Sequence, residues 1–72
     1  KAHDDGSTPL LIASENGHVE VAMILVDGGA DINKAANDGQ TPLYVASQNG
    51  HAEVARILVD GGADINKAAN DG

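Results

Sequence analysis

The chain has 72 residues, no cysteine, one aromatic residue and a formal net charge of −7, with 11 acidic against 4 basic side chains. The lack of cysteine excludes disulfides and thiolate metal sites. Because the chain has a single aromatic residue, a core must be built from aliphatic side chains. The excess of acid repels phosphate backbones and argues against a nucleic-acid partner. No apolar run approaches the ~20 residues that span a membrane.

The acidic balance has two interpretations. It keeps an exposed surface soluble, or it attracts a basic partner and speeds its association. The chain shows no signal-peptide pattern. We therefore expect a soluble protein, intracellular rather than secreted, with no compartment specified.

The sequence repeats itself with a period of 33 residues. Residues 34–66 align with 1–33 without a gap and differ from them at eight positions. Residues 67–72 then repeat 34–39 unchanged. Repetition at such a period is typical of stacked repeat architectures.

We expect a single array over residues 1–72. Its units are predicted at 5–37 and 38–70, and the C-terminal residues begin a third unit. Such a chain is either cut from a longer array or meets other copies of itself at its ends.

The first helix of each unit is predicted at 9–15 and at 42–48. Each follows a Thr-Pro pair, in which Thr suits the N-cap and Pro suits the first helical position. Asn-Gly at 16–17 and at 49–50 ends these helices, since Gly readily adopts the left-handed conformation of a C-terminal cap.

The second helix of each unit is predicted at 19–26 and at 52–59. Val21, Ile24 and Leu25 lie at spacings of three and four residues, which places them on one apolar stripe, and the second unit repeats this pattern. A Gly-Gly pair follows each helix and ends it. One unit cannot bury this stripe alone, so the units must stack.

The remaining part of each unit is polar, with Asn-Asp-Gly at 37–39. This turn chemistry suits a hairpin. Each unit is therefore predicted to run through helix, tight turn, helix and extended hairpin.

These units resemble the ankyrin repeat. The resemblance rests on TPL, NGH, EVA and GGADIN at fixed offsets in DGSTPLLIASENGHVEVAMILVDGGADIN (5–33) and in DGQTPLYVASQNGHAEVARILVDGGADIN (38–66). The period of 33 residues is also that of the family. The resemblance implies an α-helical repeat fold, the ankyrin solenoid, with stacked helix-turn-helix units and projecting β-hairpin loops.

Two positions depart from the family pattern. The usual His after TPL is replaced by Leu11 and Tyr44, and the usual Asp three residues before the glycine of the DG pair is replaced by His3 and Ala36. We expect the first change to remove a local hydrogen bond and to leave the fold intact.

The positions that differ between the units indicate a partner-binding surface. Several fall on the hairpin tips and the exposed side of the first helix, which in the resembled family form the concave binding face. The candidate contact residues are His3, Asp4, Asp5, Ser7, Glu15, Ala36, Asn37, Asp38, Gln40, Tyr44, Gln48 and Asn49. Tyr44 either anchors a partner or packs its ring against the stack.

No metal site or cofactor is expected. His18 and His51 occupy equivalent positions in units stacked ~8–10 Å apart, too far to share a zinc ion bound at ~2 Å. Counted from Asp31, the fifth and sixth positions of a calcium loop hold Ala35 and Ala36, so that pattern fails.

The resemblance and the lack of a catalytic set predict a non-catalytic protein–protein interaction module or scaffold rather than an enzyme. Its partner would be a protein, in particular a basic one, or another copy of the chain. The alternative is a structural role, in which the nearly identical ends stack head to tail into a filament or a longer solenoid.

Asn33 and Asn66 each end an Asp-Ile-Asn motif. Ankyrin hairpins of this kind resemble targets of an oxygen-dependent asparaginyl hydroxylase, which makes both residues candidate hydroxylation sites. The alternative is that each Asn only fixes the hairpin by hydrogen bonds.

Overall fold

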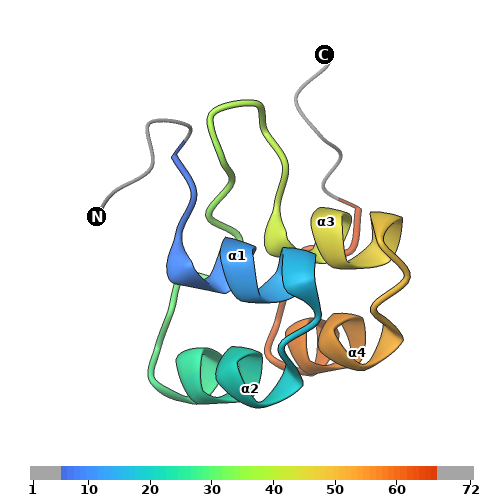
Figure 1. Cartoon of the computed structure of the whole chain (residues 1–72). Helices are drawn as coiled ribbons and strands as arrows, with labels where there is room; N and C mark the ends of the chain where they lie inside the picture. The colour runs from blue at the N-terminus through green and yellow to red at the C-terminus, as the bar shows by residue number, and fades with distance from the viewer. Residues whose placement is uncertain (1–5, 67–72) are drawn as a thin grey trace.

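The computed structural model describes residues 6–66, which form two stacked helix-turn-helix units (Figure 1). The first unit contains α1 (Pro9–Asn16) and α2 (Val19–Asp27), and the second contains α3 (Pro42–Gln48) and α4 (Ala52–Asp60). Helix α1 packs on α3, and α2 packs on α4. The helices therefore form two layers, with α1 and α3 in one and α2 and α4 in the other. This arrangement confirms the predicted helical repeat.

The first helix of each unit begins at the predicted Thr-Pro pair. The Thr8 hydroxyl oxygen accepts a hydrogen bond from the backbone N–H of Leu11, and the Thr41 hydroxyl accepts one from Tyr44, each at 3.1 Å. These bonds satisfy donors that the first turn of a helix leaves without an intrahelical partner.

The predicted glycine signals also end the helices. Gly17 caps α1 with φ 73°, and Gly29 follows α2 with φ 92°. Both values lie in the left-handed region, where a residue with a Cβ is strained. Three helices extend one residue beyond the predicted end, and α3 ends where predicted.

The core lies between the two layers and between the two units. Its buried apolar members are Leu10, Ala13, Ala22, Ala46, Val54, Leu58 and Ala63. Alanines make up most of this set, and their small side chains bring the helices close together. Ser14 is also fully buried.

A loop at residues 28–41 joins α2 to α3 and extends beyond the layer of α1 and α3 (Figure 1). The backbone N–H of Ala36 donates to the carbonyl oxygen of Gln40 at 3.0 Å, and that of Gly39 donates to Ala36 at 2.8 Å. These bonds close a turn, but residues 6–66 contain no β-strand. The predicted β-hairpin is therefore not confirmed, because a closed turn without a ladder of paired residues makes no strand.

Candidate functional site

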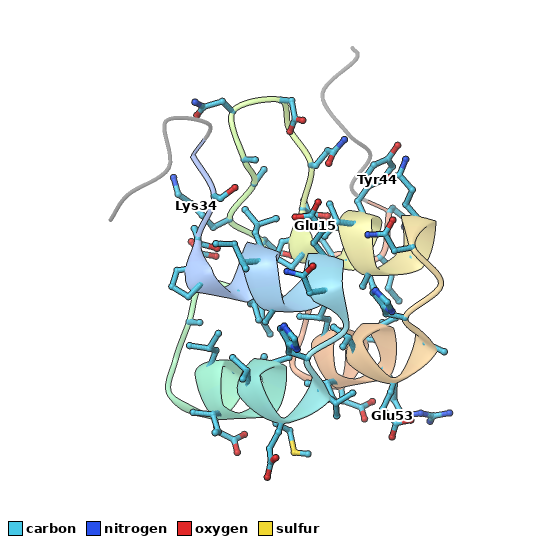
Figure 2. All side chains as sticks on the ribbon, in the orientation of Figure 1. Glu15, Lys34, Tyr44 and Glu53 are labelled. Carbon is cyan, nitrogen blue, oxygen red and sulfur yellow. The ribbon has the colours of Figure 1, made fainter. Side chains whose placement is uncertain are left out.

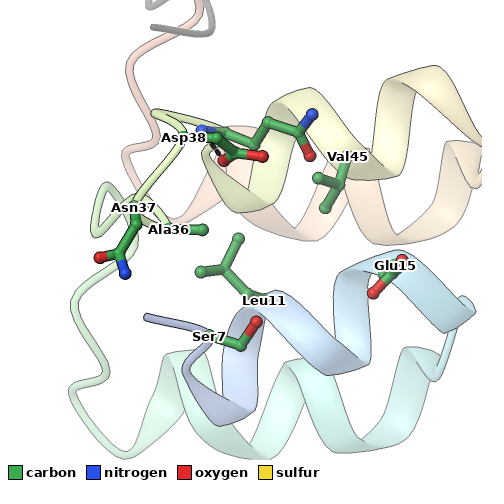
Figure 3. Close-up of a pocket in the computed structure, with 8 residues that line it drawn as sticks. Ser7, Leu11, Glu15, Ala36, Asn37, Asp38 and Val45 are labelled. Carbon is green, nitrogen blue, oxygen red and sulfur yellow. Dashed lines mark hydrogen bonds between the residues drawn. The ribbon is translucent and has the colours of Figure 1, made fainter. Parts of the chain in front are cut away.

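A groove runs between the loop tip and the first helices of the two units (Figure 3). Its lining residues come from α1, α3, the loop and the segment before α1: Ser7, Leu11, Glu15, Ala36, Asn37, Asp38, Gln40 and Val45. Leu11 of α1 and Val45 of α3 are nearly fully buried. They form an aliphatic floor where the two units meet.

Two carboxylates lie beside this floor. Glu15 is exposed near the end of α1, on the side of the helix layer from which the loop extends (Figure 2). Asp38 is exposed at the loop tip, where its Oδ1 accepts a hydrogen bond from the backbone N–H of Gln40 at 3.1 Å. The described residues that line the groove include no lysine or arginine. The groove is therefore acidic at its edges and apolar at its base.

The structure brings half of the predicted contact residues together. Ser7, Glu15, Ala36, Asn37, Asp38 and Gln40 all line the groove. Gln48 and Asn49 are exposed at the end of α3. The predicted contacts His3, Asp4 and Asp5 lie outside the described residues.

Tyr44 lies away from the groove. It lines a separate apolar hollow on the C-terminal side of the second unit, together with Val59 and Ile65. The residue is half-buried, and its role as an anchor for a partner remains a prediction.

Leu11 and Val45 were not predicted as groove residues. Both belong to pairs of positions that differ between the units, and that difference was the available signal. Their aliphatic character pointed to the core instead, and both side chains are indeed almost inaccessible.

The family model for ankyrin repeats (3 copies) matches residues 1–69. The chain belongs to the ankyrin repeat family. Ankyrin repeats are generally non-catalytic protein–protein interaction modules, which is the general role that the sequence predicted. No curated protein sequence matches the chain. The unit boundaries at 5–37 and 38–70 remain a prediction.

Polar side chains join the two ankyrin units. Asn49 donates from Nδ2, and His51 from Nε2, to the backbone carbonyl oxygen of Glu15, each at 3.0 Å. The backbone N–H of Asp64 donates to Oδ1 of Asn33 at 2.8 Å. These bonds explain why the NGH and DIN motifs suit a stacked repeat, because each motif supplies a contact between neighbouring units.

The two candidate hydroxylation sites are both exposed. Asn33 also takes part in the contact between units, which agrees with the alternative that this residue fixes the loop. Hydroxylation of Asn33 and Asn66 remains a prediction.

Residues 6–66 contain no group of three or more His, Cys, Asp or Glu side chains placed to hold a metal ion. In this same part of the chain, every helix is too short or too polar to cross a membrane.

Proposed function

We propose that this chain is a non-catalytic interaction module or scaffold that binds a basic protein segment in the groove between the loop and the α1–α3 layer. The observation that carries the proposal is the pairing of an aliphatic floor with two carboxylates. Leu11 and Val45 form the floor, and Glu15 and Asp38 lie beside it.

Each part of the groove suits a different part of such a segment. An aliphatic side chain of the partner would lie over Leu11 and Val45. These two residues are already only 4% and 7% exposed, so the apolar area that the complex buries comes mainly from the partner's own side chain. Lysine or arginine side chains flanking it would meet Glu15 and Asp38. Exposed charges of this kind act mainly on the association rate and on partner choice.

The groove is built on ordered elements. Its floor belongs to helices packed into one layer, and its loop side is closed by the hydrogen bonds of Ala36 and Gly39. Binding to a preformed surface costs less conformational entropy than ordering a loop. The groove can therefore hold a partner without rearranging the fold.

The experiment begins with a peptide library of unbiased composition, selected for binding to the 72-residue chain. The affinity of selected peptides is then measured by fluorescence anisotropy against the chain and two variants. Glu15→Gln with Asp38→Asn removes both groove charges, and the Asn can still accept the turn hydrogen bond. Glu53→Gln removes an exposed charge from α4, in the opposite helix layer (Figure 2).

We expect peptides rich in lysine or arginine around one aliphatic residue, and binding that weakens as salt is added. Two exposed charges contribute about 0.4–2 kcal/mol together, so the double variant should weaken binding roughly 2- to 30-fold, and Glu53→Gln should not. The proposal is wrong if the selected peptides carry no basic residues, or if both variants weaken binding equally.

A further inference from the structure

The second unit has an open apolar face on its C-terminal side. This C-terminal face consists of Leu43, Tyr44, Ser47, Ala55, Val59 and Ile65. Ile65 is 66% exposed and Val59 is 40% exposed. These are large aliphatic side chains left in contact with solvent.

The same six positions of the first unit are covered. They are Leu10, Leu11, Ser14, Ala22, Val26 and Ile32, each 33 residues earlier. Ser14 is 0% exposed, whereas Ser47 is exposed. Since the two units have nearly the same sequence and the same helices, this difference comes from the neighbouring unit that covers the first. The C-terminal face is thus the same surface without its cover.

The first unit has the complementary open face. This N-terminal face consists of Thr8, Pro9, Val21, Leu25 and Ala30, and the residues 33 positions later in the second unit are all buried. Val21 is 47% exposed, whereas its equivalent Val54 is 0% exposed. The chain therefore carries both halves of one interface, one half on each side.

The apolar contacts between the units show how the two open faces would fit. A Cβ built on Gly61 would lie 2.7 Å from Cδ1 of Ile32 and 2.8 Å from Cγ1 of Val26, so these side chains fill the space above that glycine. A Cβ built on Gly28, the equivalent residue, meets only backbone carbonyl oxygens of its own helix. Val59 and Ile65 are the equivalents of these two side chains, so in another copy they are the residues that would fill this open space.

The polar contacts repeat in the same register. His51 lies over Gly17, whereas a Cβ on the equivalent Gly50 would meet nothing within 4 Å. Another copy's His18 can occupy that space and donate to the backbone carbonyl oxygen of Gln48. The acceptor is a backbone atom, so the replacement of Glu15 by Gln48 between the units does not affect this bond.

Some sequence differences between the units touch this interface, including Asn37, which lies against Gly6 of the preceding unit. Leu11 and Val45, which meet between the units, correspond to Tyr44 and Ile12 between copies. These replacements keep large apolar surfaces in contact, and Tyr44 adds a hydroxyl group that must reach solvent or a hydrogen-bond partner at the edge of the contact.

We propose that a second copy of this chain docks head to tail, its N-terminal face on the C-terminal face of the first. The contact continues the interface between the two units. It joins unlike faces, so it does not close on itself and permits open chains of copies. This goes beyond the proposed function, because it uses neither Glu15 nor Asp38 and leaves the groove open.

The experiment is sedimentation velocity of the 72-residue chain over a concentration series, with variants that block one face each. Val21→Glu blocks the N-terminal face and Val59→Glu the C-terminal face. Ile65→Glu is a second variant of the C-terminal face, outside the helices.

Met23→Glu is the matched control. Met23 is also exposed on α2, but its equivalent in the second unit, Arg56, is exposed and already charged. Circular dichroism checks that each variant keeps its helices.

We expect a ladder of species beyond the dimer for the chain and for Met23→Glu. Each face variant should lose association at least tenfold, because a charge would be buried without a partner. An equimolar mixture of Val21→Glu and Val59→Glu should form dimers and nothing larger, since it contains one intact pair of faces. A chain that stays monomeric, a mixture that does not dimerise, or association that survives both variants would each overturn the proposal.

Discussion

His51 donates a hydrogen bond from Nε2 to the backbone carbonyl oxygen of Glu15, and its ring lies over Gly17 in the preceding unit. A Cβ built on Gly17 would lie 2.8 Å from two ring atoms. His51 therefore ties the turn of one unit to the turn of the next, whereas the identical motif places His18 in solvent.

This contrast predicts unequal effects of the same substitution. His51→Ala removes a hydrogen bond and leaves a gap between the units, which we expect to destabilise the chain by about 1–2 kcal/mol. His18→Ala should change the free energy of unfolding by less than about 0.5 kcal/mol. Urea unfolding followed by circular dichroism, at a concentration where the chain is monomeric, measures both. Equal effects would contradict the role assigned to His51.

A second prediction concerns the glycines in the two NGH motifs. Gly17 and Gly50 have nearly the same conformation, with φ 73° and 76°, so an alanine at either position costs ~1–2 kcal/mol of backbone strain. Gly17→Ala must in addition displace the His51 ring, whereas Gly50→Ala meets open space. We therefore expect Gly17→Ala to be the more destabilising of the two.

A double-mutant cycle isolates this extra cost. In a His51→Ala background, the added methyl group at residue 17 has no ring to displace. Gly17→Ala and Gly50→Ala should then destabilise the chain equally, as measured by urea midpoints. A difference that persists without the His51 ring would show that it arises elsewhere.

Local signals in the sequence were sufficient to predict the helices. Thr8 and Thr41 form the expected caps, and Gly17 adopts the expected left-handed conformation. These features depend on residues close in the chain, so they can be read from a short stretch of sequence. The loop tip was predicted as a turn for the same reason, although the hairpin strands around it are not confirmed.

The sequence could not show which of two identical residues is buried. Val21 and Val54 have nearly the same local sequence, yet one is exposed and the other is not. Their difference depends on which unit has a neighbour on that side. The same geometry places Tyr44 on the C-terminal face rather than in the groove, because helical spacing alone does not specify the direction in which units stack.

A third prediction concerns the asparagines of the two DIN motifs. Oδ1 of Asn33 accepts a hydrogen bond from the backbone N–H of Asp64, whereas the side chain of Asn66 is exposed and accepts no hydrogen bond from residues 6–66. We expect Asn33→Ala to destabilise the monomer by ~1 kcal/mol and Asn66→Ala to have almost no effect. Thermal unfolding of dilute samples compares them, and similar losses of stability would count against a contact between units.

The candidate hydroxylation of these residues needs a separate measurement. Mass spectrometry of peptides from native material would show one added oxygen on Asn33 or Asn66 if either is modified. Peptides that cover both residues without that added mass would exclude the modification in the material tested.

The last prediction rests on a buried hydroxyl group. Ser14 is fully buried, and its Oγ has no hydrogen-bond partner among residues 6–66. A buried polar atom without a partner has lost its hydration without compensation, so removing it should stabilise the chain. Ser47 occupies the same position in the second unit but is exposed, and Ser47→Ala is therefore the matched control. Both substitutions gain the same helix propensity, so the difference between them reports burial alone.

We expect Ser14→Ala to be more stable than Ser47→Ala by ~1 kcal/mol, or about 4–8 °C in Tm for a domain of this size. Calorimetry of dilute monomer measures both, and a Ser14→Ala that is the less stable of the two would mean that the hydroxyl group has a partner or fills needed space.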